Sequence, residues 1–100
     1  MYQIVNSQLL MDFWTWYPES QEPLKAWYHL VKEQSWQTPE EVLQTFPTAE
    51  LGKNNQIRFP VVPHPYYVLT SLHLGFQVLV IRGVGSLPQL EETLSEHQRG

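Results

Sequence analysis

Residues 66–83, YYVLTSLHLGFQVLVIRG, decide the fold of this chain. Two runs within them, 66–74 and 77–83, are rich in the aromatic and β-branched residues that favour strands. Gly75 and Phe76 separate the two runs, and a glycine at the first position of a two-residue turn is typical of a β-hairpin. The stretch therefore predicts an antiparallel hairpin that turns at Gly75.

The position of the turn determines the register of this hairpin. If Leu74 pairs with Gln77, the side chains alternate between two faces along both strands. The predicted pairs are Leu72 with Leu79, Ser71 with Val80, Thr70 with Ile81 and Leu69 with Arg82. The first face, which we expect to pack on helices, holds Tyr66, Val68, Thr70, Leu72, Leu79 and Ile81. The second face holds Tyr67, Leu69, Ser71, His73, Val78, Val80 and Arg82.

The second face is more apolar than a sheet surface in water usually is, so we expect something to cover it. One candidate is a C-terminal helix, which is predicted by a cap at Ser86, a proline at position 88 and a stripe of three leucines. The other candidate is a partner protein or a second copy of the chain. Both remain open, and together they give a candidate partner-binding surface of Leu69, Val80, Leu87, Leu90 and Leu94.

Two longer helices are predicted before the hairpin. Asn6 or Ser7 is suited to cap the first helix, which Pro18 ends. Ser20 is suited to cap the second helix, whose first turn contains Pro23. Apolar side chains recur at three- and four-residue steps in both helices and predict a helical hairpin. These side chains are Leu10, Phe13, Trp14 and Tyr17 in the first helix, and Leu24, Trp27, Tyr28 and Val31 in the second.

A short third helix and a strand are predicted between this helical hairpin and the β-hairpin. Thr38 can cap the helix, Pro39 fits its first position, and Glu41 lies where a capping box needs it. Residues 52–55, GKNN, are typical of a turn, and the next residues alternate as strand residues do. We expect this strand to stop at Pro60, because proline has no N–H to donate to a sheet.

These elements predict an α+β fold in a single domain that spans residues 1–100. The N-terminal helical hairpin and the short third helix pack on a curved antiparallel sheet, and a C-terminal helix follows. Hydrophobic residues make up 42% of the 100 residues, which is enough to bury one core. We expect Trp14, Trp27 and Trp36 to pack in that core and between helices rather than to hold a ligand.

Composition limits the functions that we expect. The chain has no cysteine, and its four histidines lack ligand spacing, so neither a metal nor another cofactor is expected. No apolar run reaches the ~20 residues that cross a bilayer, and no signal peptide is evident, so we expect a cytoplasmic protein. Six basic and ten acidic residues give a formal net charge of −4, which opposes long-range attraction to a nucleic-acid backbone.

Aromatic residues, aromatic–proline pairs and several other residues stand at fixed separations along the chain. They include Phe13-Trp14, Tyr17-Pro18, Leu24, Ala26-Trp27-Tyr28, Leu30-Val31, Trp36, Phe46-Pro47, Ala49, Phe59, Tyr66, Ile81-Arg82 and Val84-Gly85. Together with the order of the elements, this pattern resembles the HigB family of toxins in the RelE-type superfamily. The resemblance runs from about residue 7 to residue 91 and implies a RelE-like fold.

The resemblance implies a toxin component of a type II toxin-antitoxin system in the bacterial cytoplasm. Members of the family look like ribosome-dependent endoribonucleases, or mRNA interferases, that bind RNA and inhibit translation. Cleavage of this kind uses no metal, because an RNA 2′-hydroxyl attacks the neighbouring phosphate while cationic side chains stabilise the developing charge. The implied partners are a helix-turn-helix antitoxin (HigA-like), the ribosome and mRNA, and a homodimer is a further alternative.

The chain departs from the family pattern at several residues that this chemistry uses. Tyr67 stands where the family has an arginine after its strand tyrosine, and Val62 and Ser71 occupy positions where basic residues are expected. Leu87 and Leu90 replace the histidine and tyrosine of the family's Thr-His-x-x-Tyr-Asp pattern. Because each lost contact of this kind costs roughly 3 kcal/mol, two hypotheses stay open. One is a toxin nuclease of low activity, and the other is an inactive RelE-fold module that binds an antitoxin or regulatory partner through the second face.

Five residues are candidates for an RNA site. Arg82 matches a cationic position of the family and is the first catalytic candidate, and Tyr67, which can donate a proton or stack on a base, is the second. Lys53, Arg58 and His73 are candidate RNA-binding residues. Plainer roles remain open as well: Arg82 in an ion pair, Tyr67 in packing and His73 as an ordinary surface histidine.

Overall fold

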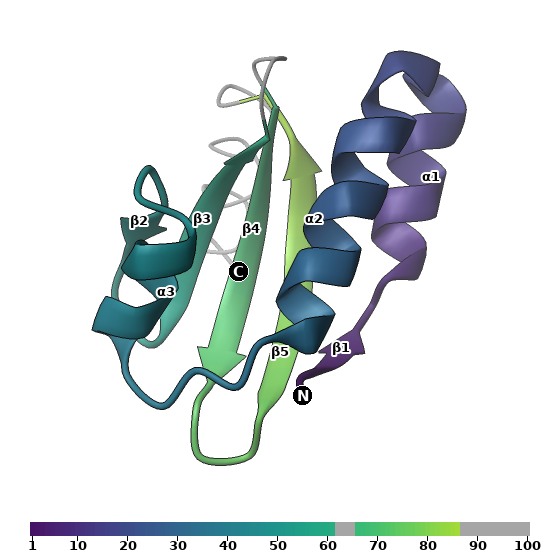
Figure 1. The fold of residues 1–100 in the computed structure, drawn as a ribbon. Helices are drawn as coiled ribbons and strands as arrows, with labels where there is room; N and C mark the ends of the chain where they lie inside the picture. Colours follow the sequence, from purple (N-terminus) through teal and green to yellow (C-terminus); the bar gives the residue numbers. More distant parts are fainter. Residues whose placement is uncertain (62–65, 87–100) are drawn as a thin grey trace, which may run out of the picture.

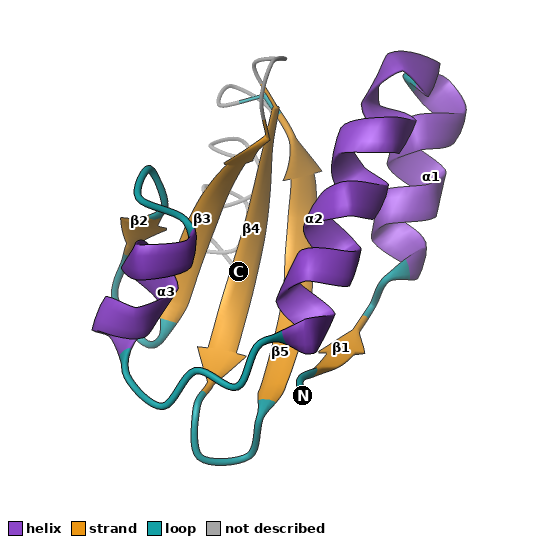
Figure 2. Ribbon diagram, viewed as in Figure 1, coloured by secondary structure: helices purple, strands orange, loops and turns teal. Residues whose placement is uncertain are grey.

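The computed structural model describes residues 1–61 and 66–86, and these form an α+β fold as expected. Figure 1 and Figure 2 show helices gathered on one face of a sheet whose strand order is β1-β5-β4-β3-β2. The elements are β1 (Gln3–Val5), α1 (Gln8–Trp16), the 3-10 helix η1 (Pro18–Ser20), α2 (Gln21–Glu33), α3 (Pro39–Thr45), β2 (Glu50–Leu51), β3 (Gln56–Val61), β4 (Tyr66–His73) and β5 (Val78–Gly85). The predicted C-terminal helix, with Leu87, Leu90 and Leu94, lies outside the described residues.

The helical hairpin of α1 and α2 is confirmed, although neither predicted cap works through its side chain. Ser7 and Ser20 are the N-cap residues of α1 and α2, and neither side chain accepts a capping hydrogen bond. The Ser20 hydroxyl instead donates to the Tyr17 carbonyl at 2.7 Å. This contact fixes the tight bend through η1 that returns α2 alongside α1.

The capping box of α3 is confirmed in both directions. The Thr38 hydroxyl accepts from the Glu41 N–H at 3.4 Å, and the Glu41 carboxylate accepts from the Thr38 N–H at 3.3 Å. Two donors that the first turn of a helix leaves unpaired are thereby satisfied. The cap positions α3 on the same side of the sheet as α2, beside β2 and β3 (Figure 1).

The hairpin register is confirmed near the turn and wrong farther from it. Leu72 pairs with Leu79, Ser71 with Val80 and Thr70 with Ile81, as predicted. Leu69, however, pairs with Gly83 and not with Arg82. Arg82 is the extra residue of a β-bulge, which leaves it opposite no residue of β4.

The turn of this hairpin also differs from the expectation. The N–H of Gln77 donates to the carbonyl of Leu74 at 3.3 Å, and the residue with positive φ is Gln77 at 54°, not Gly75. The Gln77 side-chain amide donates to the Trp36 carbonyl and to the Leu74 carbonyl, both at 2.9 Å. These two hydrogen bonds offset the strain of a left-handed backbone at a residue that has a Cβ.

The expectation that β3 stops at Pro60 is wrong. Pro60 pairs with Tyr67 inside the strand, which continues to Val61. The Asn55 carbonyl accepts a hydrogen bond from the Leu72 N–H of β4, and the Gln56 carbonyl accepts one from the Gly52 N–H on the opposite side. Even-numbered residues of β3 therefore direct their backbone N–H and C=O groups away from β4. Strand β2 pairs only with residues 57 and 58 of β3. At Pro60, which has no N–H, no described strand therefore lies on that side of β3 to need a donor.

The sheet is mixed and not wholly antiparallel, because β1 joins it. Residues 3–5 pair in parallel with residues 78–80 of β5, a strand that the sequence analysis does not predict. The pairing begins where the Gln3 N–H donates to the Gln77 carbonyl at 2.9 Å. The N-terminus is thereby held at one edge of the sheet, next to the hairpin turn (Figure 1).

The core lies between the helices and the first face of the hairpin. Phe59 is its centre, fully buried, with ring centroids of Trp27, Phe46 and Trp36 at 5.4, 5.1 and 6.5 Å. The first face is confirmed as the core face, since its members are buried there or pack against that core. Trp14 packs on the core from α1, so the structural role expected for the tryptophans is confirmed.

Candidate functional site

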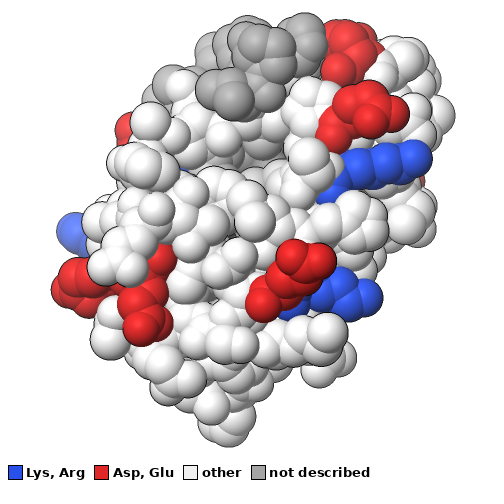
Figure 3. All heavy atoms as spheres, viewed as in Figure 1, with Lys and Arg blue, Asp and Glu red and all other residues white. Residues whose placement is uncertain are grey.

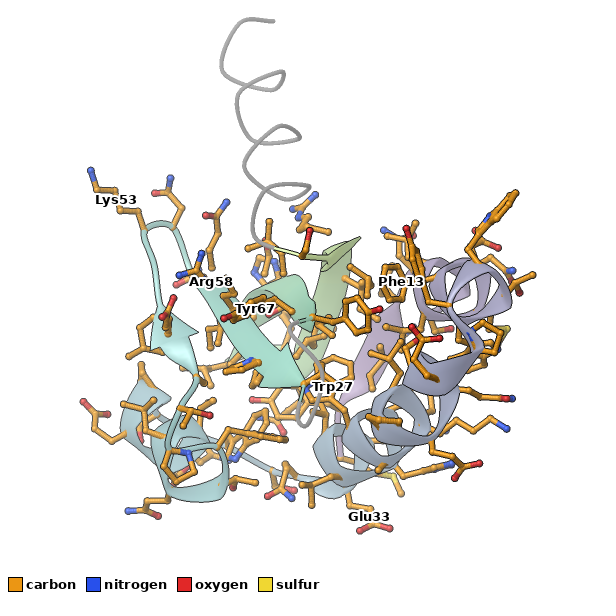
Figure 4. The ribbon with its side chains drawn as sticks, turned by 90° about the horizontal axis from the view of Figure 1, so that it is seen from above. Phe13, Trp27, Glu33, Lys53, Arg58 and Tyr67 are labelled. Carbon is orange, nitrogen blue, oxygen red and sulfur yellow. The ribbon has the colours of Figure 1, made fainter. Side chains whose placement is uncertain are left out.

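The second face lies on the side of the sheet opposite α1, α2 and α3. Figure 4 shows Tyr67 and Arg58 on that side, opposite Trp27 of α2. Arg58 joins the second face from β3 because it pairs with Leu69 of β4, and paired residues share a face. Glu50 joins from β2 because it pairs with Arg58. A row of cross-strand neighbours therefore runs Glu50, Arg58, Leu69 and Gly83 across four strands.

Arg82, the first catalytic candidate, is exposed at the bulge in β5. Its Nε donates a hydrogen bond to the Ser71 hydroxyl at 3.0 Å. Ser71 belongs to the second face and is 5% exposed, so the contact holds the guanidinium over this face. Alternation along β5 puts Arg82 on the same face as Val80, and the bulge leaves it opposite no residue of β4.

Tyr67, the second catalytic candidate, lies beside Arg58. The guanidinium carbon of Arg58 is 5.4 Å from the centroid of the Tyr67 ring, which is a cation–π contact. Arg58 also forms an ion pair with Glu50. Its Nε is buried and has no hydrogen-bond partner among the described residues. The Arg58 guanidinium is therefore held near the Tyr67 ring by groups on both neighbouring strands.

Lys53 and His73 lie at one end of the second face. Lys53 is exposed in the turn between β2 and β3, where Asn54 and Asn55 adopt left-handed backbone angles of 57° and 64°. The Asn55 carbonyl accepts from the Leu72 N–H at 2.8 Å, which brings this turn beside the end of β4 that carries His73. Tyr67 lies at the opposite end of β4, so the five candidates are spread along the face and do not form a single cluster.

Charge is divided between the two sides of the described structure. The helical side carries Asp12, Glu19, Glu22, Glu33, Glu40 and Glu41 with only Lys25 and Lys32 among them. Figure 3 shows these acidic side chains over α3 and around α2. The second face and its rim carry three of the five described lysines and arginines, Lys53, Arg58 and Arg82, against Glu50. The chain is acidic as a whole, but its sheet side is locally cationic.

The middle of the second face is apolar, in agreement with the sequence pattern. Leu69 is 7% exposed and does not belong to the core cluster on the other face. Val80 is half-buried on the neighbouring strand. Of the candidate partner-binding residues, these two lie side by side on the sheet, and the three leucines of the C-terminal segment lie outside the described residues.

Two hollows lie on opposite sides of the described structure. One, of about 320 Å³, opens between α1 and α2 and is lined by Ser7, Leu10, Met11, Trp14, Lys25, Tyr28 and His29. The other, of about 210 Å³, lies at the β2–β3 edge of the second face and is lined by Glu50, Leu51, Gly52, Gln56, Arg58 and Leu69. Sequence reasoning missed Glu50 and Gln56, since β2 has two residues and no pattern marks it as a strand.

Tyr66, the neighbour of Tyr67 in β4, belongs to a different environment. Its hydroxyl donates to the Glu19 carboxylate at 2.8 Å, and this hydrogen bond is the main reason that the pKa of Tyr66 is raised. Its ring packs edge-on against Phe13 with a centroid distance of 5.0 Å. Tyr66 therefore joins the sheet to the helical side, as expected for the first face, and leaves Tyr67 as the tyrosine of the second face.

Comparison with known proteins identifies one family. The family model described as HigB toxin, the RelE-like toxic component of a toxin-antitoxin system, matches residues 20–91. No curated protein matches the chain. The matched residues include α2, α3 and strands β2 to β5, so they include the whole row of residues on the second face. Within residues 1–61 and 66–86, no helix is long and apolar enough to span a membrane.

Proposed function

The chain belongs to the HigB toxin family of RelE-like toxic components of toxin-antitoxin systems, and on this premise we propose that it acts on RNA through its second face. A toxin of such a system works with an antitoxin, and we propose a helix-turn-helix protein (HigA-like) in that role. The proposed target is mRNA on the ribosome in the bacterial cytoplasm. Inhibition of translation is the expected result.

The observation that carries this proposal is the division of charge. RNA binding depends first on cationic side chains that neutralise phosphates. Lys53, Arg58 and Arg82 are distributed over the second face and its rim, while six of the seven described acidic residues lie on the helical side. An approaching RNA strand is therefore attracted to the sheet and repelled from the helices, although the net charge of the chain is negative.

The proposed chemistry is attack of an RNA 2′-hydroxyl on the adjacent phosphate. The bond from phosphorus to the 5′-oxygen breaks, leaving a 2′,3′-cyclic phosphate and a 5′-hydroxyl. Arg82, held by Ser71, is the group that stabilises the extra negative charge on the phosphate. Tyr67 is the group that donates a proton to the leaving oxygen. The 2′-hydroxyl gives its proton to solvent in this scheme.

We expect this cleavage to be slow. Two arginines, one tyrosine and one histidine on the second face do not form a single cluster, and leucines stand at 87 and 90 where the family pattern has a histidine and a tyrosine. A single lost transition-state contact lowers a rate by about 10²–10³. A turnover well below that of a complete family site is therefore the expected property of this chain.

The test is expression of the chain with and without its antitoxin, followed by primer extension on a translated message. Arg82→Ala should lower the cleavage rate at least tenfold, a loss of about 1.4 kcal/mol or more. Lys32→Ala, which removes one cation from the helical side, is the matched control and should leave cleavage unchanged. Unchanged cleavage in Arg82→Ala would mean that the catalytic group lies elsewhere.

A second candidate function is an inactive module that binds a partner through the same face. Val80, half-buried in the middle of this face, favours it, because an apolar centre with a polar rim is typical of a protein interface. Under this alternative the chain neither arrests growth nor cuts messages when it is expressed alone. Val80→Glu should then weaken antitoxin binding or a homodimer at least tenfold while the circular dichroism of the monomer stays unchanged.

A further inference from the structure

The hollow at the β2–β3 edge has the dimensions and lining of a small ligand site. Its volume of about 210 Å³ is below the 300–1,000 Å³ that is typical of pockets for larger ligands, so it suits one flat ring system. Leu51 and Leu69 make part of its lining apolar, while Glu50, Gln56 and Arg58 bring charged and amide groups to it. We call it the edge hollow.

Arg58 supplies a flat surface to this hollow. The guanidinium is fixed in orientation, because its carbon lies over the Tyr67 ring and one terminal nitrogen is bound by the Glu50 carboxylate. Bases of single-stranded RNA stack on arginine planes and on aromatic rings. An arginine whose guanidinium is already held in place by two contacts loses little freedom when a base stacks on it, so this planar group is prepared for stacking.

Glu50 gives the hollow a preference among the bases. Its carboxylate binds Arg58 through Oε2, and an ionised carboxylate has acceptor capacity for further donors. Guanine is the RNA base with two adjacent donors, N1–H and the 2-amino group, on its Watson–Crick edge. Adenine presents one donor beside one acceptor there, cytosine presents one donor beside two acceptors, and uracil presents a single donor between two acceptors, so each leaves part of the carboxylate unmatched.

We propose that the edge hollow is a subsite for one nucleobase of single-stranded RNA and that it prefers guanine. In this subsite the base lies against Arg58 and Leu69, and Glu50 accepts from its Watson–Crick edge. Gln56, on the same side of β3 as Arg58, lines the hollow beside them. The inference rests on the proposed function, because it requires RNA on the second face, and it adds the base and the residues that select it.

The experiment is fluorescence anisotropy of the full chain with short RNA probes. The probes are 2′-O-methyl hexamers, which lack the attacking hydroxyl and stay intact: all-uridine, one internal guanosine, and one internal inosine. Inosine lacks the 2-amino group of guanosine. The guanosine probe should bind about tenfold more tightly than the all-uridine probe, and the inosine probe should lose most of that preference.

Glu50→Gln is the variant that tests the acceptor. Glutamine has the same shape but offers one acceptor and one donor group, so the ratio of the guanosine to the all-uridine affinity should fall to about one. We compare this ratio of affinities because removing a negative charge near RNA changes the affinity for both probes by a similar factor, which cancels in the ratio. The matched control is Glu33→Gln, an exposed change on α2 at the opposite side of the molecule, which should keep the tenfold ratio (Figure 4).

The outcomes separate this inference from the proposed function. Equal binding of guanosine and all-uridine probes by the unchanged chain overturns the guanine subsite and leaves RNA binding by the second face in place. A preference that survives in Glu50→Gln also overturns the subsite. Failure to bind any of the probes overturns the proposed function, and the subsite with it.

Discussion

Arg82 and Ser71 are joined across β5 and β4 by a hydrogen bond of 3.0 Å from Nε to the serine hydroxyl. Ser71 pairs with Val80, and Arg82 follows two positions later on the same strand. Arg82 follows Val80 by two positions and therefore lies on the second face, where its side chain reaches the buried Ser71 hydroxyl. The orientation of the most important candidate side chain thus depends on a serine at a position where the family pattern expects a basic residue.

Ser71→Ala should reduce RNA cleavage by about two- to tenfold, because one hydrogen bond of about 0.5–1.5 kcal/mol no longer orients Arg82. The reduction should be smaller than that in Arg82→Ala, since the cation itself remains. Primer extension under single-turnover conditions measures both rates. Equal losses in the two variants would contradict a positioning role for Ser71.

Lys53→Ala should weaken binding of all the RNA probes by a similar factor, because Lys53 lies at the rim in an exposed turn and contributes charge without selecting a base. The slope of log affinity against log salt should fall by about one. Anisotropy titrations between low and moderate salt measure this slope. Lys32→Ala on α2 serves as the control and should leave the slope as it is.

Phe59→Leu should lower the free energy of unfolding by roughly 1–3 kcal/mol. Phe59 is fully buried among Trp27, Phe46 and Trp36, and leucine leaves part of that ring space empty. Urea unfolding followed by tryptophan fluorescence measures the change. Phe76→Leu, the same substitution at an 85% exposed position of the hairpin turn, should change the stability by less than about 0.5 kcal/mol.

Tyr2 should make the fold less stable at high pH. Burial is the main cause that raises the pKa of Tyr2, although the hydrogen bond from Gln77 acts in the opposite direction. Between the ordinary value of about 10 and the higher folded value, the unfolded chain releases a proton that the folded chain keeps. The free energy of unfolding therefore falls as the pH rises through this interval. The stabilising contribution of Tyr2 is fully present at pH values below the interval.

Tyr2→Phe is the variant that checks this effect. It removes the hydrogen bond of 2.8 Å from the Tyr2 hydroxyl to the Trp36 carbonyl, so stability at pH 7 should fall by about 1 kcal/mol. Gln77 also donates to that carbonyl, so the acceptor does not become unsatisfied. Urea unfolding from pH 8 to pH 11 should show a shallower alkaline decline in the variant. An identical decline in both proteins would assign the effect to other tyrosines.

Elements with local signals could be predicted from the sequence. Thr38, Pro39 and Glu41 define the start of α3 within four residues, and the capping contacts are those that the spacing indicates. The hairpin pairs next to the turn are correct for the same reason, because they follow from alternation over a few residues. Such features depend on neighbours in the chain and not on the rest of the fold.

Elements that depend on distant pairing could not be predicted. The bulge at Arg82 lies next to Gly83, but a neighbouring glycine does not by itself show which residue is extra, and one extra residue shifts every later pair of β5. The strand β1 is three residues long and exists because β5 provides a parallel edge. Pro60 is tolerated inside β3 because β2 does not extend beside it, which is a property of the sheet and not of the proline.

The candidate site also has one part that could be predicted from the sequence and one part that could not. The apolar middle of the second face follows from alternation in β4 and β5, and Leu69 and Val80 lie where the pattern indicates. The contacts of Arg58 with Glu50 and Tyr67 require three strands in a particular register, one of which has two residues. Sequence alone therefore indicated the candidate cations but not which residues hold them.

The parallel pairing of β1 with β5 has a consequence for how the protein is made. A ribosome synthesises β1 well before β5, which is the only described partner strand of β1. The nascent polypeptide must keep these early residues unpaired until β5 arrives, and a contact between segments so far apart closes late and slowly. The bulged strand that carries Arg82 is the same late strand, so under the proposed function an incomplete polypeptide lacks the proposed catalytic cation.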